Sequence, residues 1–458
     1  MAKQRFITDF TTGSVPRQLL QFATPLFLAN LLQVVYNMAD MVIVGQVMES
    51  VGLSAVSIGG DVSSFLTFVA MGFSNAGQVI ISQYIGAGQR KKVGAFVGSM
   101  FTFLTGCAVV LSVVCLFFRE SILALMNTPA ASWQEALNYS TVCIAGLIFI
   151  YGYNMVSAVL RGMGDSKHPF IFIAMAAIVN IVLDIVLVWG FRMGAMGAAI
   201  ATVFSQGLSF VCCAIFLWRS RHEMDFEISP EDFLHPKKEY LSALTKLGVP
   251  MAIKSASIHF SKLFVNSWIN SYGVAVSAMA GIVNKLGSIC NLISNSVNAA
   301  GSSMVGQNVG AQKFERVPRI MITCFAFTLC TASLMSAVVY LFPKAVFGIF
   351  TDEAAVLAIA MEFLPIAVVL FLGSACRSPM NALINGSGNH RVNFATAILD
   401  GLVMRIGLSI LFGLILDMKY LGFWLGDALA GYTPFFIGLV YYFSGSWKTR
   451  KHVIKEEA

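Results

Sequence analysis

The sequence predicts an all-α polytopic membrane protein whose twelve transmembrane helices form two parallel six-helix repeats. Three observations lead to this fold class: an apolar composition, a series of stretches long enough to span a bilayer, and a repeat between the two halves. Of the 458 residues, 57% are hydrophobic and only 12% are charged, and 37 are Phe. Soluble globular domains carry about 25% charged residues. A soluble fold is therefore excluded.

Apolar stretches follow one another along the chain, separated by short segments that hold most of the Lys, Arg, Pro and Gly. A transmembrane helix needs roughly 20 predominantly apolar residues. The twelve predicted spans are 18–45, 52–85, 93–118, 134–160, 169–190, 195–218, 241–271, 275–303, 318–343, 354–385, 393–416 and 420–445. The polar residues 1–13 lack the pattern of a cleavable signal peptide, so the first span is expected to direct insertion.

Basic residues are concentrated in alternate loops. Twenty Lys and Arg lie in the two termini and in the loops on the same side of the membrane, whereas the opposite loops hold four: Arg119, Arg192, Lys344 and Lys419. Positively charged flanks stay in the cytoplasm during insertion. Both termini are therefore predicted to be cytoplasmic, and the net charge of +7 indicates topology rather than a nucleic-acid-binding surface.

The two halves repeat one another at an offset of 224 residues. QYIGAGQRKKV at 83–93 aligns with QNVGAQKFERV at 307–317, and RGMGDSKHPF at 161–170 aligns with NGSGNHRVNF at 385–394. Because six is an even number of helices, both halves start in the cytoplasm and the repeats are parallel. The predicted domains are an amino-terminal lobe 1–218, a cytoplasmic linker 219–240, a carboxyl-terminal lobe 241–447 and a cytoplasmic tail 448–458.

Asp40 lies inside the first predicted span. A charged Asp at the centre of a transmembrane helix costs about 2.5–3.5 kcal/mol on insertion scales, so this side chain is expected to face a polar interior. The spacing places four polar residues on one helical face: Gln33, Tyr36, Asn37 and Asp40. A structural alternative is a polar stripe that only joins helices, but an ionisable group in the stripe favours a functional role.

The span 169–190 contains a second such pair, Asn180 and Asp184, which lie one helical turn apart in an apolar run. Asp40 and Asp184 both come late in outward-going helices, so we expect them to meet in the extracellular half of the amino-terminal lobe. Two carboxylates brought close repel one another, which favours uptake of a cation between them. The same oxygens fit a proton or Na⁺, and the sequence leaves both open.

The order of these motifs resembles the multidrug and toxic compound extrusion (MATE) family, and the similarity extends over residues 14–445. The motifs that carry it are Pro25, the polar stripe ending at Asp40 and Val44-Gly45, the loops GAGQRKKV and RGMGDSKHP, and the pair Asn180 and Asp184. The resemblance implies twelve helices in two lobes around a V-shaped central cavity. It also implies export of amphipathic, often cationic compounds in exchange for H⁺ or Na⁺, by rocking of the two lobes.

In one branch of that family the coupling cation is bound at positions that match Asp40, Asp184 and Asn180 and, less closely, Asn154. The resemblance therefore implies a cation site at these residues, with a Na⁺ site at Asp40, Asp184 and Asn180 as one form of it. Gln33, Tyr36 and Asn37 would line the substrate cavity or support the site. The resemblance further implies a functional monomer in the inner (plasma) membrane that contributes to antibiotic resistance.

No phosphate loop, nucleophile elbow or H-E-x-x-H motif is present in the sequence. We therefore expect a transporter driven by an ion gradient rather than an enzyme, with no cofactor. Its expected partners are amphipathic small molecules and membrane lipid, and no nucleic acid. An ion channel is the less favoured alternative because of the two-lobe repeat.

The carboxyl-terminal lobe differs from another branch of the family, in which acidic residues of this lobe form the cation site. The corresponding helices carry basic residues instead: Lys254, His259, Lys262 and Lys285. We expect internal ion pairs with partners in the last two spans, where the candidates are Asp400, Arg405 and Asp427. The lysines also keep a second function open, a flippase for lipid-linked saccharide precursors from the same broader superfamily.

Overall fold

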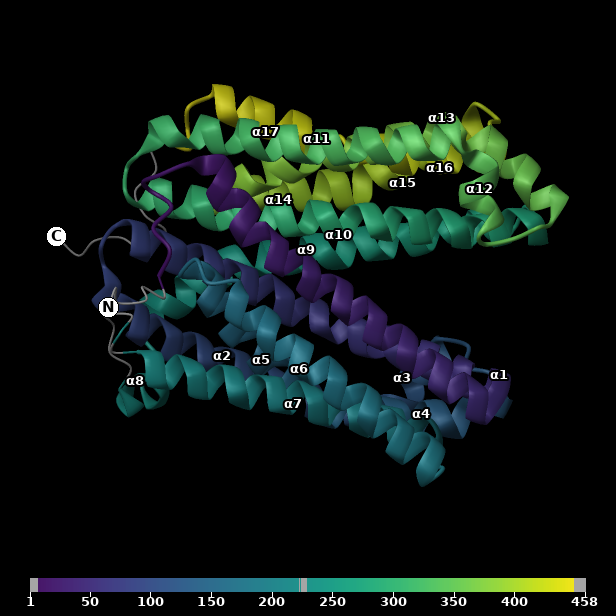
Figure 1. Cartoon of the computed structure of the whole chain (residues 1–458), viewed down its shortest axis with the longest axis horizontal. Helices are drawn as coiled ribbons and strands as arrows, with labels where there is room; N and C mark the ends of the chain where they lie inside the picture. The colour runs from purple at the N-terminus through teal and green to yellow at the C-terminus, as the bar shows by residue number, and fades with distance from the viewer. Residues whose placement is uncertain (1–6, 222, 224–228, 449–458) are drawn as a thin grey trace. The chain divides into compact units, whose positions relative to one another are not determined.

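A computed structural model describes residues 7–221, 223 and 229–448. The described residues form helices joined by short connections, with no β-strand among them (Figure 1). Lys3, Arg5, most of the predicted linker's centre and the tail beyond Lys448 lie outside the described residues. Predictions that concern these segments stay predictions.

The described residues of the first half form eight α-helices and a π-helical segment. They are α1 Val15–Gly86, α2 Arg90–Phe117, α3 Arg119–Leu125, α4 Trp133–Ala145, α5 Leu147–Gly162, α6 Lys167–Asp184 with the π-helical Ile185–Gly190, α7 Gly194–Ser220 and α8 Pro230–Leu234. Within this half, α7 packs against α4, α5 and α6, and α2 packs against α5.

In the second half, residues up to Lys448 form nine α-helices and two π-helical segments. They are α9 Lys238–Asn270, α10 Val274–Gly310, α11 Val317–Leu341, α12 Pro343–Gly348, α13 Ala354–Gly386, α14 His390–Ile398, the π-helical Leu399–Met404, α15 Arg405–Ile410, the π-helical Leu411–Ile415, α16 Lys419–Ala430 and α17 Thr433–Phe443. Here α13 packs against α10, α11, α16 and α17.

The described residues contain fewer separate helices that are long and apolar enough to cross a membrane than the twelve predicted spans. Among the described residues, nine helices are long and apolar enough to cross a membrane, and the pair α4 and α5, bent by 48°, makes a tenth. α1 contains two predicted spans, because its 72 residues are interrupted at Glu49, whose backbone is not helical. α9 has 33 residues but carries Lys246, Lys254 and Lys262, which lower its apolar character. These two features account for the remaining spans.

The backbone repeats between the halves at the predicted offset. Residues with positive φ recur 224 residues apart at Glu49 and Gly273, Gly88 and Gln312, and Gly164 and Gly388. They recur 225 residues apart at Arg192 and Asp417, and at Gly194 and Lys419. L-residues rarely adopt this conformation, so five matched pairs confirm the internal repeat independently of the residue types. One residue has been added to the second half between Gly388 and Asp417.

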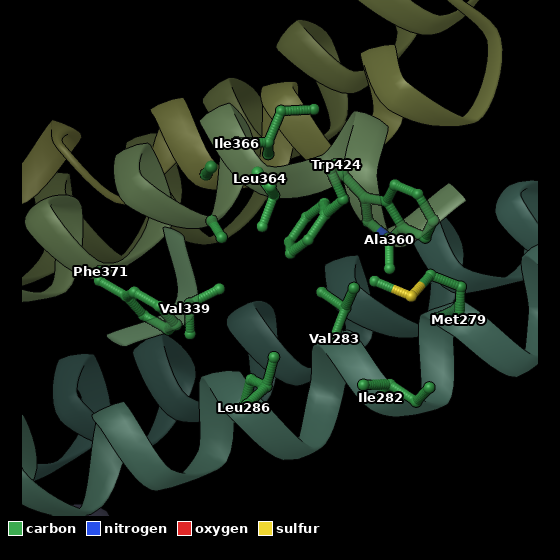
Figure 2. Close-up of a cluster of buried hydrophobic side chains, with 14 of the residues drawn as sticks. Met279, Ile282, Val283, Leu286, Val339, Ala360, Leu364, Ile366, Phe371 and Trp424 are labelled. Carbon is green, nitrogen blue, oxygen red and sulfur yellow. The ribbon is translucent and has the colours of Figure 1, made fainter. Parts of the chain in front are cut away.

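The described residues separate into two compact units, one made of those within 1–9 and 24–248 and one of those within 10–23 and 249–458. In the second unit, buried apolar side chains of α10, α13 and α16 form one continuous core that Val339 of α11 joins (Figure 2). Phe363 and Trp424 contribute aromatic rings to this core, with ring centroids 5.2 Å apart. The lobe boundaries and the arrangement of the lobes stay predictions.

Candidate functional site

Three polar side chains of the first unit lie together in its interior. Asp40 of α1 is 3% exposed, and Asn180 and Asp184 of α6 are fully buried. The carboxyl groups of Asp40 and Asp184 are within hydrogen-bonding reach of one another, and Asn180 lies against Asp40. The structure therefore brings together the two carboxylates and the amide that the sequence singles out.

Thr202 of α7 joins this group and connects two of its members. Its Oγ1 donates to Asp40 Oδ2 at 3.1 Å and accepts from Asn180 Nδ2 at 3.5 Å. The group of Asp40, Asn180, Asp184 and Thr202 is called the carboxylate cluster below. Its side chains come from three helices, so a change at the cluster affects the packing of α1 against both α6 and α7.

The carboxylate cluster contains more acceptors than donors. Among the described residues, four of its buried oxygens have no hydrogen-bond partner: Asp40 Oδ1, Asn180 Oδ1 and both carboxylate oxygens of Asp184. Buried acceptors without a donor cost about 1–3 kcal/mol each, and more when charged. A proton or a hard cation supplies what these oxygens lack, because hard cations prefer oxygen ligands. The residues present therefore fit H⁺ or Na⁺.

A second contact between α1 and α7 lies one helical turn from the cluster. Gln206 Nε2 donates to the Tyr36 hydroxyl at 2.9 Å, and Tyr36 is 4% exposed. Along α1, Tyr36 comes before Asp40. Along α7 their partners come in the reverse order, with Thr202, the partner of Asp40, before Gln206. The helices α1 and α7 are therefore antiparallel here. Each pair is spaced by four residues, which places both contacts on one face of each helix.

The rest of the predicted polar stripe is divided by the structure. Gln33 and Asn37 are exposed, whereas Tyr36 and Asp40 are buried. Gln33 is still within hydrogen-bonding reach of Tyr36. Asn154 of α5 is half-buried, and its Nδ2 donates to the backbone oxygen of Ile150 in the same helix at 2.8 Å. Within the described chain Asn154 makes no hydrogen bond to either carboxylate, and its role stays a prediction.

Sequence reasoning missed Thr202, Gln206 and Tyr139. Tyr139 of α4 is 6% exposed and lies beside the carboxylate cluster, where the electrostatic influence of Asp40 and Asp184 reaches it. A side chain at Gly59 would come within 2.3 Å of the Tyr139 ring, so the glycine permits this packing. Thr202 and Gln206 are four residues apart in the sequence, as are Tyr36 and Asp40. This matching spacing is the one sequence signal that could have identified Thr202 and Gln206.

Comparison with known families decides which transporter class this is. The MatE family model matches two segments, 25–186 and 250–411, which together make up more than half of the chain. This chain belongs to the MatE family. The two matched segments begin at Pro25 and Pro250, which correspond within one residue at the repeat offset of 224.

Individual relatives agree with the MatE assignment over nearly the full length. The chain is 28% identical over 444 residues to "Probable multidrug resistance protein YpnP" of Bacillus subtilis (strain 168), covering 97% of this chain and 98% of that protein. It is 23% identical over 450 residues to "Probable multidrug resistance protein NorM" of Thermotoga maritima, covering 96% and 95%. The structure of an outward-facing multidrug resistance MATE family transporter has the same fold, with a TM-score of 0.89, 20% identity and coverage of 98% and 100%.

The second unit of this MatE chain buries charge as well, but in ion pairs. Arg405 of α15 is 2% exposed; its Nη2 donates to Asp400 Oδ1 at 3.0 Å and its Nη1 donates to Asp427 Oδ1 of α16. The two expected acidic partners therefore pair with Arg405. Among the described residues, Lys254, Lys262 and Lys285 form no ion pair, which corrects the expectation for them. Lys254 Nζ donates to Asn381 Oδ1 instead.

Proposed function

We propose that this chain is a secondary active antiporter of the plasma membrane that exports amphipathic compounds in exchange for H⁺ or Na⁺. The observation that carries the proposal is the carboxylate cluster, two buried carboxylates that form no ion pair with Lys or Arg within the described residues. Buried charges are usually paired inside the protein. A pair left without an internal cation is suited to bind one from outside. The names of its MatE relatives indicate that the exported compounds are drugs.

In the proposed cycle the coupling cation and the drug bind to different conformations. A cation at the carboxylate cluster cancels the repulsion between Asp40 and Asp184 and favours tighter packing of α1 against α6 and α7. That repacking lowers the affinity for the drug, so cation entry releases it outside. The two lobes rock between inward-open and outward-open states, as in transporters built from parallel repeats. A cation that bound both conformations with equal affinity would not shift the equilibrium between them. Coupling therefore depends on the difference between the cation affinities of the two conformations.

Asp40→Asn tests the role of the carboxylate cluster. The amide keeps the shape of the side chain but carries no titratable proton and binds cations less strongly. We expect normal insertion, drug binding within about threefold of wild type, and gradient-driven drug uptake into everted vesicles reduced at least about tenfold. Asp61→Asn is the matched control, since Asp61 lies in the second predicted span of α1, beyond the break at Glu49, and is exposed. Full coupling in Asp40→Asn at normal expression would sink the proposed site.

The identity of the coupling ion is tested separately. Drug uptake is measured in vesicles with an imposed pH gradient at zero sodium and with an imposed sodium gradient at uniform pH. A response to only one gradient, lost in both Asp40→Asn and Asp184→Asn, assigns that ion to the cluster. A response that survives in both variants contradicts a site at these residues.

A lipid flippase is the second candidate function, favoured by one observation. A cavity in the second unit is lined by the basic side chains Lys262, Arg377 and Arg405. Translocation of a fluorescent lipid-linked saccharide in proteoliposomes, together with no response to ethidium or norfloxacin, would replace the drug exporter by this function.

A further inference from the structure

The segment that leads into α1, residues 10–13, is held by side chains of the second unit. Phe10 is fully buried, and its ring centroid lies 5.0 Å from that of Phe22 in α1. Phe10 N donates to Gln307 Oε1 at 2.9 Å, and Asn308 Nδ2 donates to Phe10 O at 3.0 Å. Gln307 and Asn308 are themselves fully buried near the end of α10. The contact is therefore part of the interior of the second unit.

Two basic side chains complete this contact. Lys313 Nζ donates to Thr11 O at 3.0 Å and to Thr11 Oγ1 at 3.1 Å. Arg316 Nη2 donates to three backbone oxygens of residues 10–13, at 3.1 to 3.3 Å. Neither basic side chain forms an ion pair within the described residues. Hydrogen bonds from charged donors are the stronger ones, and leading segments of a domain are poorly ordered unless they are tied down. Residues 10–13 together with Gln307, Asn308, Lys313 and Arg316 are called the amino-terminal anchor below.

The four side chains of the amino-terminal anchor all lie in QNVGAQKFERV at 307–317, one of the loops that repeat between the halves. In its first-half counterpart, Tyr84 and Gln89 stand where Asn308 and Lys313 stand here. The donors that hold residues 10–13 are therefore particular to the second half. The carboxylate cluster gives this loop no role.

The anchored helix belongs to both units. Residues 10–23 are part of the second unit, whereas the chain from Thr24 onward, with Asp40, is part of the first. Before the anchor the chain is again part of the first unit, where Thr8 N donates to Met163 O at 3.2 Å. α1 keeps helical backbone angles from Val15 up to Glu49. Rigid helices can carry a displacement from one site to another. α1 therefore joins the carboxylate cluster to a fixed point in the second unit.

α9 has the same property with the two units exchanged. Its first residues, 238–248, are part of the first unit, and the rest is part of the second. The Tyr240 ring lies 5.9 Å from that of Phe96 in α2. Just before α9, Thr102 Oγ1 of α2 donates to Phe233 O at 2.6 Å. The first helix of each repeat thus starts in the unit opposite to the one that its later part joins.

We propose that the amino-terminal anchor positions α1 for coupling. It keeps the start of α1 attached to the second unit throughout the transport cycle, so that repacking of α1 at the carboxylate cluster acts on the second unit. Without the anchor the cation still binds at Asp40, but the displacement of α1 is lost at its free end. This inference deepens the proposed function and rests on it for the transport cycle.

Phe10→Ala and Arg316→Gln test the proposal through three measurements. These are the rise in unfolding temperature that the coupling cation causes, the drug affinity without that cation, and gradient-driven drug uptake. The first reports cation binding, because a ligand of the folded state stabilises it. We expect the first two to stay within about twofold of wild type and uptake to fall at least about tenfold, since only the transmission through α1 is broken. Wild-type uptake in both variants, or an equal loss of all three quantities, overturns the proposal.

Three further variants separate positioning from folding. Arg319→Gln is the matched control, because Arg319 is exposed on α11 and its side chain takes no part in the anchor; all three quantities should equal those of wild type. Phe10→Leu keeps most of the buried volume and Arg316→Lys keeps a charged donor, so both should recover most of the uptake. If Phe10→Ala does not fold, as judged by gel filtration, Arg316→Gln decides the question.

Attachment of α1 can be measured without drug transport. Spin labels at Ser14→Cys and Arg319→Cys, both exposed, report a distance within the second unit once the nine native cysteines are replaced by Ala. The distance distribution should be the same with and without the coupling cation and should widen in Phe10→Ala. A cation-dependent distance, or a distribution that stays narrow in Phe10→Ala, overturns the proposal.

The two proposals fail in different ways. Failure of the proposed function appears as a wild-type protein without gradient-driven drug uptake, whatever the spin-label distance. Failure of this inference appears as full coupling in wild type and equally in Phe10→Ala and Arg316→Gln.

Discussion

The two repeats place different chemistry at the same points of one scaffold. In the first, Asn180 contacts Thr202; in the second, Arg405 contacts Asp427, and each second-repeat residue lies 225 positions after its counterpart. The offset changes from 224 to 225 because a π-turn accommodates one extra residue, and the π-helical Leu399–Met404 lies directly before Arg405. The two contacts therefore occupy equivalent positions in the two repeats. The side chains are neutral in the first repeat and charged in the second.

This difference shows how two repeats of one fold use buried carboxylates for different purposes. The second repeat pairs its carboxylates Asp400 and Asp427 with the built-in positive charge of Arg405. The first repeat leaves Asp40 Oδ1 and both carboxylate oxygens of Asp184 without a donor among the described residues. A permanent counter-charge stabilises structure, whereas a missing one creates a binding site for a mobile ion. Each of the following predictions would break or sharpen that contrast.

The largest expected effect is at Arg405. Arg405→Gln leaves Asp400 and Asp427 buried without a cation, and removal of one partner of a buried ion pair costs about 3–5 kcal/mol. We expect a marked fall in the unfolding temperature in detergent and in the yield of folded protein. The variant with Asp400→Asn and Asp427→Asn added should recover most of the loss. An Arg405→Gln protein as stable as wild type would contradict a structural role for the pair.

Asp40→Asn and Asp184→Asn should behave in the opposite way. Each removes half of an unpaired carboxylate pair, so the unfolding temperature should stay equal to that of wild type or rise. Coupled transport should fall at least about tenfold in each. The double variant should lose little more than either single one, because groups that act as a unit are not additive. Strictly additive losses would indicate two separate sites.

Thr202→Val should have an intermediate effect. It removes the hydrogen bond to Asp40 Oδ2 at similar volume, and a hydrogen bond to a charged group contributes about 1.5–3 kcal/mol. Cation-induced drug release should therefore need at least about tenfold more cation, while drug affinity without the cation stays the same. Thr202→Ser keeps the hydroxyl and should restore the wild-type response. An equal shift in both variants would assign the effect to the lost methyl group.

The smallest effect should come from the contact between Tyr36 and Gln206. Tyr36→Phe and Gln206→Leu each remove a neutral hydrogen bond of about 1 kcal/mol between α1 and α7. A double-mutant cycle on the unfolding free energy should give an interaction energy of about 0.5–1 kcal/mol. An interaction energy of zero would show that the two side chains act independently, and α1 would then depend on the carboxylate cluster alone for its polar contact with α7.

Most of the fold follows from the sequence because its signals are long and repeated. Twelve apolar stretches and the matching loops at 83–93 and 307–317 each involve many residues, so the helices and the repeat could be predicted. The break at Glu49 lies between the first two predicted spans. The π-helical segments could not be predicted, because an added residue in an apolar helix leaves no mark on composition.

The carboxylate cluster was only partly visible in the sequence. Asp40, Asn180 and Asp184 are conspicuous, since charge and amides are costly in apolar helices. Thr202 is not, because a hydroxyl in a helix can bond to its own backbone and needs no partner elsewhere. Arg377 was missed for a different reason: its place at the cavity depends on how α13 is rotated against α10. Rotation of this kind is set by packing of the whole bundle and not by local pattern.

The extra residue at Leu399–Met404 also sets a rule for engineering. An inserted residue turns everything after it by about 100° around the helix axis, so a graft copied at a constant offset of 224 would point its side chains into the wrong neighbours. To move the α6 and α7 members of the carboxylate cluster into the second half, a designer would write Asn at Arg405, Asp at Ser409 and Thr at Asp427, one position later than the loop alignment suggests. Duplicated halves diverge in the register of their helices as well as in residue type. The one-residue change of register must be corrected before residues are exchanged.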